Sequence, residues 1–172
     1  PSGNFPAVRE SPAAVYDKAT NHMIVFGGIL SASSSAFTNY NDAWVLTNAN
    51  GLSGMSQWIQ LTPSGTLPAP RSGHSAVYDS AGNRLLIFGG RTVPNSGPDP
   101  TFNDIWVLTA ANGVGGQPQW GKRTLSGVAP APRLMNAVGY APANGRMMIV
   151  MGHNNNLNPV FLGDVWMLPQ AF

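Results

Sequence analysis

An apolar run that ends at glycine occurs three times along this chain, and its spacing constrains the fold more than any other feature. The central copy spans residues 84–90, with one copy upstream at 23–28 and one downstream at 148–153. Phe26 and Phe88 are 62 positions apart, and Phe88 and Met151 are 63 positions apart. A period of this length predicts a repeat architecture in which each unit buries its apolar faces against its neighbours.

Further markers keep the same period, so the repeat is not the accident of one hydrophobic run. A Pro-Ala-x-Arg segment ends at Arg9, Arg71 and Arg133, and a tyrosine follows each arginine at Tyr16, Tyr78 and Tyr140. An Asp-x-Trp motif follows each glycine-ended run, at Asp42 and Trp44, Asp104 and Trp106, and Asp164 and Trp166. A further tryptophan, Trp58 or Trp120, follows the first two motifs only.

This combination resembles the kelch repeat, in which an apolar run ends in a glycine pair and an Asp-x-Trp motif follows. The resemblance covers nearly the whole chain and implies a β-propeller, an all-β fold of four-stranded antiparallel blades around a central channel. Two features depart from the pattern. His153 stands where the third pair would have its second glycine, and a period near 62 exceeds the roughly 50 residues usual for kelch units, which predicts long loops.

Each repeat is expected to supply four strands. The first strand is predicted near Ala13–Tyr16, the second is the glycine-ended run, the third carries the Asp-x-Trp motif, and the fourth begins at Trp58 or Trp120. Turn residues such as Asn83 and Gly145 lie between the first two strands, where tight hairpins require positive φ. The predicted units span residues 1–62, 63–124 and 125–172, the last without its outer strand.

Alternating connections sort the loops onto two faces. The loops that enter each repeat and the loops that follow each glycine pair share one face, which we call the loop face. The loops after the glycine pairs, at 29–41, 91–103 and 154–163, vary most between repeats. Variable loops on a repeated frame are where binding specificity usually lies, and the kelch resemblance implies a partner on this face.

Composition excludes several functional classes. Charged residues make up 9% of the chain and the net charge is +2, so no dense basic surface is expected and nucleic acid is not a predicted partner. No apolar stretch is long enough to span a membrane. Cysteine is absent, which excludes disulfides and thiolate metal sites. Low charge and loops rich in Asn, Ser and Thr predict a secreted, periplasmic or cell-surface protein.

Five residues are candidates for ligand binding. Rotation about a propeller axis would bring Arg9, Arg71 and Arg133 into a partial ring that could hold a carboxylate or sulfate. The alternative is that each arginine caps loop carbonyls or packs against the neighbouring blade. His74 occupies the position of Pro12 and Asn136, and His153 interrupts the glycine pattern on the loop face.

The repeated acidic and aromatic residues are expected to be structural. Asp42, Asp104 and Asp164 should accept backbone N–H bonds as they enter their strands. The tryptophans two positions later should pack between blades, although a sugar-stacking platform is the alternative. The scattered histidines predict no metal site and no cofactor, with weak Ca²⁺ binding by the Asn-rich loops left open.

The sequence therefore predicts a non-catalytic binding scaffold whose ligand is a protein or a glycan. Some carbohydrate-active enzymes resemble kelch propellers, so a carbohydrate-binding or carbohydrate-active module is one alternative. A structural module of a cell-surface or filamentous assembly is another. No carboxylate pair or Ser-His-Asp set is apparent from the spacing.

Three full units would need 186 positions against the 172 present, so further blades or a second copy of the chain are expected to complete the ring.

Overall fold

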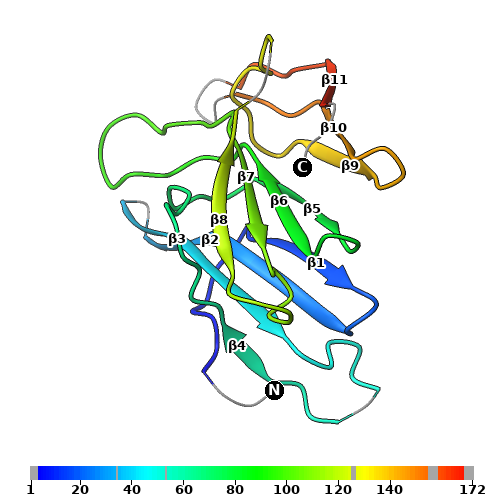
Figure 1. Ribbon diagram of the computed structural model, residues 1–172. Helices are drawn as coiled ribbons and strands as arrows, with labels where there is room; N and C mark the ends of the chain where they lie inside the picture. Colours follow the sequence, from blue (N-terminus) through cyan, green and yellow to red (C-terminus); the bar gives the residue numbers. More distant parts are fainter. Residues whose placement is uncertain (1–3, 34, 53, 125–126, 155–158, 169–172) are drawn as a thin grey trace.

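The computed structural model describes residues 4–33, 35–52, 54–124, 127–154 and 159–168. These residues form three antiparallel sheets in chain order and contain no helix, which confirms the all-β propeller-type prediction (Figure 1). The first sheet has the order β1 (Ala13–Asp17), β2 (His22–Ser33), β3 (Ala36–Leu46) and β4 (Trp58–Gln60). We call the three sheets blades 1, 2 and 3.

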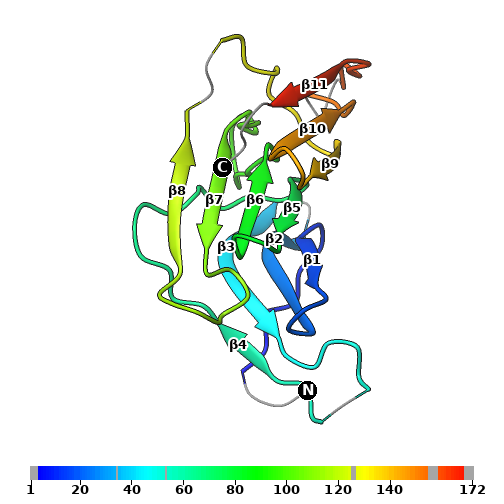
Figure 2. The same cartoon turned by 45° about the vertical axis from the view of Figure 1, so that its right-hand side comes forward.

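Blades 2 and 3 repeat this meander. Blade 2 contains β5 (Ser75–Asp79), β6 (Arg84–Phe88), β7 (Ile105–Thr109) and β8 (Gln119–Arg123). Within the described residues blade 3 contains three strands, β9 (Ala137–Ala141), β10 (Arg146–Val150) and β11 (Val165–Leu168). Strands β1, β5 and β9 lie side by side, so the first strand of each blade is the innermost (Figure 2).

The predicted hairpin turns have the backbone geometry that their residues favour. Asn21 and Asn83, at the turns into β2 and β6, have φ values of 57° and 48°, and Gly145 at the turn into β10 has a φ of 64°. Asparagine and glycine tolerate this left-handed region better than other residues. The turn chemistry therefore fixes the register of the two inner strands in each blade.

Both faces of the two middle strands of blade 2, β6 and β7, are buried, which explains why these strands are apolar without alternation. Leu85 and Ile87 on β6 pack against Ile24 and Phe26 of blade 1. The intervening residues of β6, Leu86 and Phe88, point the other way and pack against blade 3. Blade 3 supplies Met147, Ile149 and Leu168 to this second core.

The predicted loop at 29–41 is wrong in blade 1, where β2 and β3 continue past the glycine pair as a long hairpin. Ile29 pairs with Asn39 and Leu30 with Thr38, beyond a bulge between Phe26 and Gly28. The equivalent segment of blade 2 contains Pro94, Pro98 and Pro100. Proline removes a backbone donor, so that segment cannot pair in the same way and remains a loop.

The structure also corrects the register of the third glycine pair. Met151, and not Gly152, is equivalent to Gly27 and Gly89, because the carbonyl groups of all three residues accept a bond from the arginine 18 positions earlier. Met151 has a φ of 58°, close to the 70° of Gly89. The spacing of this position is therefore 62 in both steps, and His153 replaces no glycine. The loop that follows is two residues shorter in blade 3, because Asp104 and Asp164 are 60 positions apart. Met151 is the true departure, at a backbone conformation that side chains seldom adopt.

Candidate protein-binding face

The loop face is built on a three-residue unit that occurs once in each blade. In blade 2, Arg71 donates two hydrogen bonds to Asp104, at 2.7 Å to Oδ1 and 3.2 Å to Oδ2. Trp106 donates its indole N–H to the same carboxylate at 2.8 Å. Blades 1 and 3 repeat the arrangement with Arg9, Asp42 and Trp44, and with Arg133, Asp164 and Trp166.

The arginines are held inside the protein and do not form a ring open to ligand. Arg71 and Arg133 are 0% exposed, and each also donates to the backbone carbonyl of the residue two positions earlier. The guanidinium of Arg9 lies over the ring of Tyr40 at 4.1 Å, and that of Arg71 over Phe102 at 4.2 Å. The arginines therefore stabilise the scaffold, in agreement with the alternative that each one caps loop carbonyls or packs against the neighbouring blade.

The backbone of each arginine segment ties one blade to the next. Gly28 donates its N–H to the carbonyl of Arg71, and Gly90 donates to that of Arg133, both at 2.8 Å. The glycine before each donor allows the close approach, because a Cβ on Gly27 would lie 2.7 Å from the Arg71 oxygen and one on Gly89 would overlap the Arg133 oxygen. The glycine pair of one blade and the arginine segment of the next blade thus together form the backbone contact, or joint, between the two blades.

Electrostatics keep the three carboxylates ionised. Burial is the largest influence on Asp104 and opposes its charge, yet hydrogen bonds from Arg71 and Trp106 and the charge of Arg71 outweigh it and lower its pKa. The same balance lowers the pKa of Asp42. In Asp164 the hydrogen bond from Arg133 is the leading cause of a lowered pKa. These aspartates were expected to accept backbone N–H bonds. In the structure their main donors are guanidinium and indole groups, and a backbone hydrogen bond adds a smaller contribution at Asp42 and Asp164.

The two candidate histidines lie in different settings. His74 is buried at the joint of blades 1 and 2, with its ring 5.4 Å from Phe26, and neither ring nitrogen has a hydrogen-bond partner in the described part of the chain. Burial, followed by the charge of Arg71, lowers its pKa to about 3, so the ring is neutral. His153 forms a backbone bridge with Leu134 and contacts the ring of Phe161 on the loop face.

The tryptophans do not form a sugar-stacking platform. Trp44, Trp106 and Trp120 are buried, and Trp106 and Trp120 belong to the core between blades 1 and 2. The indole N–H groups of Trp44 and Trp106 donate to aspartate carboxylates. Both the faces and the polar edges of these two rings therefore make contacts inside the protein.

Neighbouring loops are bonded to each other and form one continuous surface. Asn39 on the long hairpin exchanges two hydrogen bonds with the backbone of Val93, at 2.7 and 3.0 Å. Asn95 accepts a bond from the N–H of Phe37, and Thr101 donates to the carbonyl of Asn154. The three variable loops therefore hold fixed positions relative to one another.

Large apolar side chains are exposed along the loop face. Val8 and Val128, in the segments that enter blades 1 and 3, are 74% and 82% exposed, and Phe161 in the last variable loop is 78% exposed. Phe5, Leu67, Met135 and Val160 add to this set. Exposed apolar groups on linked loops mark a surface suited to contact with another macromolecule.

The described residues contain no group of three acidic or histidine side chains that could hold a metal ion. They also contain no helix long and apolar enough to cross a membrane.

Comparison with known proteins identifies the architecture. Residues 1–170 match the family model described as the KLHDC2/KLHL20/DRC7 Kelch-repeats domain. The chain belongs to the kelch-repeat family. The repeats found in the sequence are therefore kelch repeats. Kelch-repeat domains typically serve as protein-interaction scaffolds.

Several curated proteins are similar to this kelch chain. It is 30% identical over 131 residues to dynein regulatory complex subunit 7 of Chlamydomonas reinhardtii, covering 76% of this chain and 10% of that protein. It is 32% identical over 140 residues to human host cell factor 1, covering 77% of this chain and 6% of that protein. Tip elongation aberrant protein 1 of Schizosaccharomyces pombe is 31% identical over 119 residues, 69% of this chain and 9% of its own length. The chain thus spans a tenth or less of these relatives.

Solved structures support the same fold. The structure titled "Structure of YjhT" matches 88% of this chain and 36% of its own, with a TM-score of 0.58 and 18% identity. A chain from a cryo-EM structure of RAG in complex with one melted and one unmelted RSS matches 94% of this chain and 52% of its own, with a TM-score of 0.59 and 10% identity. At these identities the likeness concerns the fold alone.

The predicted secreted, periplasmic or cell-surface location is wrong. The relatives are intracellular proteins, among them a dynein regulatory complex subunit. The amide-rich loops misled the prediction, because the turns of this fold also use asparagine. Asn21, Asn48 and Asn83 all occupy left-handed turn positions, and the scaffold charges are already neutralised in Arg–Asp pairs.

Proposed function

We propose that this kelch chain is a non-catalytic scaffold that binds a partner protein through its loop face. The observation that carries the proposal is the contrast between repeated and unrepeated residues. The repeated Arg, Asp and Trp side chains are engaged with one another, whereas the exposed apolar residues Val8, Val128 and Phe161 lie at positions where the other blades have different residues. A partner would therefore meet the unrepeated residues.

A photo-crosslinking residue placed at Phe161 tests this proposal, with Met55 as the matched control site. Met55 lies between β3 and β4 on the opposite face and is 82% exposed, against 78% for Phe161. We expect a defined protein adduct from the Phe161 site that is absent from the Met55 site. Adducts of the same partners from both sites, or from Met55 alone, would show that the loop face is not the binding face.

We further propose that the outer faces of blades 1 and 3 are covered, either by further kelch blades or by a second copy of the chain. Val165 and Met167 on blade 3 are 64% and 53% exposed, although the equivalent Ile105 and Val107 of blade 2 are buried against a neighbour. Light scattering on the 172-residue chain tests this. A dimer supports the second copy, and aggregation supports further blades. A monodisperse monomer that unfolds cooperatively contradicts both.

A further inference from the structure

Asparagine followed by glycine occurs three times in this chain, at Asn50, Asn112 and Asn144. Such a pair is chemically reactive, because the backbone nitrogen of the glycine can attack the side-chain carbonyl carbon of the asparagine, and glycine has no Cβ to obstruct the approach. The first two pairs lie at equivalent positions, in the loops between the third and fourth strands of blades 1 and 2. The third pair lies in the turn between β9 and β10 of blade 3 (Figure 1).

The fold locks the pair formed by Asn112 and Gly113. Asn112 is 5% exposed, and its Nδ2 donates to the carboxylate of Asp17 at 2.9 Å. Its Oδ1 accepts a bond from the Nδ2 of Asn83 at 2.6 Å. The N–H of Gly113 donates to the carbonyl of Ala110 at 3.1 Å. The attacking nitrogen and the amide that it would attack are therefore both held, and reaction requires these bonds to open together.

The pair formed by Asn50 and Gly51 is held more weakly. The Oδ1 of Asn50 accepts bonds from the Nδ2 of Asn21 at 2.8 Å and from the N–H of Leu52 at 3.0 Å. The N–H of Gly51 donates to the carbonyl of Asn48 at 3.0 Å. The bonds of this side chain lie at the surface, so they open more easily than the buried bonds of the equivalent pair in blade 2.

The pair in blade 3 has the fewest restraints. Asn144 is exposed, and in the described residues its side chain has one hydrogen bond, accepted from the N–H of Arg146 at 3.3 Å. The described part of the chain gives the N–H of Gly145 no backbone acceptor, whereas the N–H groups of Gly51 and Gly113 each have one. The two reacting groups of this pair can therefore approach each other without the loss of a strong bond.

The accessibility of this turn is a property of the fold. The residue equivalent to Asn144 in blade 1, Thr20, is only half-buried although blade 2 packs against that blade. The loop before the fourth strand of blade 1 contacts the next residue, because Ala49 donates its N–H to the carbonyl of Asn21. Asn21 occupies the position of Gly145, so the same contact in blade 3 would engage the carbonyl of Gly145 and leave its nitrogen free to react.

We propose that Asn144 is a site of spontaneous deamidation, and that the fold protects the other two Asn-Gly pairs. The backbone nitrogen of Gly145 forms a bond to Cγ of Asn144 and loses its proton, and the side-chain nitrogen leaves as ammonia. Water then opens the resulting succinimide ring. Hydrolysis at one carbonyl gives aspartate, and hydrolysis at the other gives isoaspartate, in which the main chain runs through the side-chain carbon. Neither step needs an oxidant or a reductant.

The reaction changes blade 3 at the turn that sets its strand register. Ala141 pairs with Arg146 across this turn, and isoaspartate adds one carbon to the backbone between them. Turn length fixes the register of a hairpin, so the added carbon should loosen the pairing of β9 with β10. Both products also add a negative charge at the turn. Blades 1 and 2 should keep their geometry.

Peptide mapping by mass spectrometry tests the proposal, because it follows all three sites in one sample of the chain incubated in mildly alkaline buffer. In the folded chain we expect Asn144 to deamidate at least about tenfold faster than Asn112, with Asn50 between them, since reaction at a held site waits for local opening. A rate at Asn144 that does not exceed both other rates contradicts the proposal.

The same measurement in urea is the control for local sequence. The three rates should then agree within about threefold, because every one of these asparagines precedes glycine. Rates in urea that keep the order and spread of the folded chain would assign the difference to the neighbouring residues and would overturn protection by the fold.

Two reciprocal substitutions test the part played by the turn. Gly145→Asn copies the left-handed asparagine of blades 1 and 2, so it preserves the turn while its side chain obstructs the attacking nitrogen. This variant should slow deamidation of Asn144 at least about tenfold. Asn83→Gly copies blade 3 and removes the bond to Oδ1 of Asn112, so it should speed deamidation of Asn112 at least about threefold. An unchanged rate at the tested asparagine of either variant contradicts the proposal.

Discussion

The joint between blades 1 and 2 and the joint between blades 2 and 3 are alike near the axis. In both, an arginine carbonyl accepts the N–H of a glycine at 2.8 Å. Tyr78 bonds Asp17 of the preceding blade at 3.2 Å, and Tyr140 lies near Asp79 in the same way. Burial, followed by the neighbouring aspartate, raises the pKa of both tyrosines.

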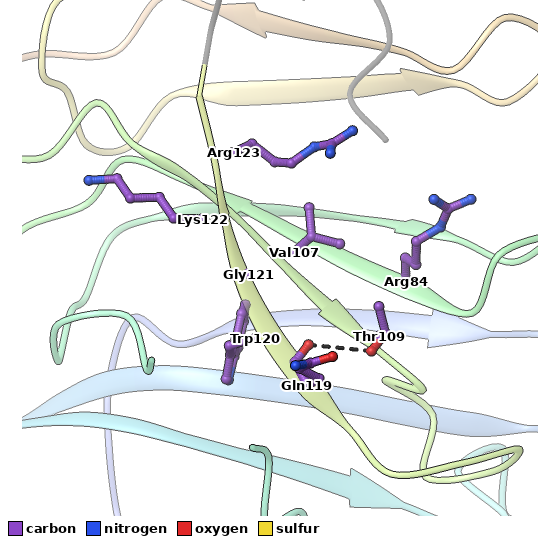
Figure 3. Close-up of a pocket in the computed structure, with 8 residues that line it drawn as sticks. All are labelled: Arg84, Val107, Thr109, Gln119, Trp120, Gly121, Lys122 and Arg123. Carbon is purple, nitrogen blue, oxygen red and sulfur yellow. Dashed lines mark hydrogen bonds between the residues drawn. The ribbon is translucent and has the colours of Figure 1, made fainter. Parts of the chain in front are cut away.

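The two joints differ at the periphery. Leu61 closes the first joint against Trp120, whereas the equivalent Arg123 of blade 2 is exposed and lines a hollow of about 380 Å³ (Figure 3). Inner positions repeat because every blade must meet its neighbour through the same backbone geometry. Outer positions are released from that requirement, so they can carry function. Variants at the two joints test this distinction.

The largest effect is expected at the inner joint, from Arg71→Ala. Removing a buried guanidinium leaves Asp104 without its main partner, which should cost about 3–5 kcal/mol of unfolding free energy. Chemical denaturation measures the loss. Arg123→Ala is the control and should change stability by less than about 0.5 kcal/mol. Similar losses from both variants would mean that the periphery is as structural as the inner joint.

Gly89→Ala should be the next most costly change. Its Cβ would overlap the Arg133 carbonyl oxygen at a φ of 70°, so we expect a loss of about 2–4 kcal/mol from left-handed strain and overpacking together. Met151→Ala, at the equivalent position, should change stability by less than about 1 kcal/mol, since Met151 is largely exposed and already has a positive φ. A small loss from Gly89→Ala would show that the joint can open without cost.

Leu61→Ala tests the apolar seal of the first joint. Leu61 is buried against Trp120, and its truncation should cost about 2 kcal/mol. The matched change in blade 2, Arg123→Leu, should be neutral or slightly stabilising, because it adds apolar surface beside Val107 without removing an ion pair found in the described chain. Thermal unfolding of both variants measures the difference, and a destabilised Arg123→Leu protein would contradict it.

His74 should give the smallest effect, visible as a pH dependence. Its pKa is about 6.5 when unfolded and about 3 when folded, so between these values only the unfolded chain binds a proton. Its contribution to stability is complete above pH 6.5 and falls as the pH decreases, by about 1 kcal/mol between pH 7 and 5.5. His74→Asn, which copies Asn136 of blade 3, should remove this dependence. An unchanged slope in that variant would show that His74 is not the titrating group.

The architecture could be predicted from the repeated motifs of the sequence. The period of 62 between Phe26 and Phe88, the glycine pairs and the Asp-x-Trp motifs predicted antiparallel four-stranded kelch blades, because hairpin turns and apolar strands are local properties that a repeat displays several times. The pairing of Arg71 with Asp104 and Trp106 was accessible in principle, since all three recur together. The sequence did not reveal it, because their separation along the chain hides their contact.

Which side chains are accessible to a ligand could not be predicted from the sequence and depends on the tertiary structure. Arg71 and Arg133 have the repeated pattern expected of ligand-binding groups and are buried, whereas Arg123 belongs to no repeated motif and is exposed on blade 2. The structure also placed Met151, and not His153, at the altered glycine position. Exposure and register depend on what the neighbouring blade brings to each position, and contacts between blades join residues far apart in the sequence. A single repeat examined alone therefore carries no information about them.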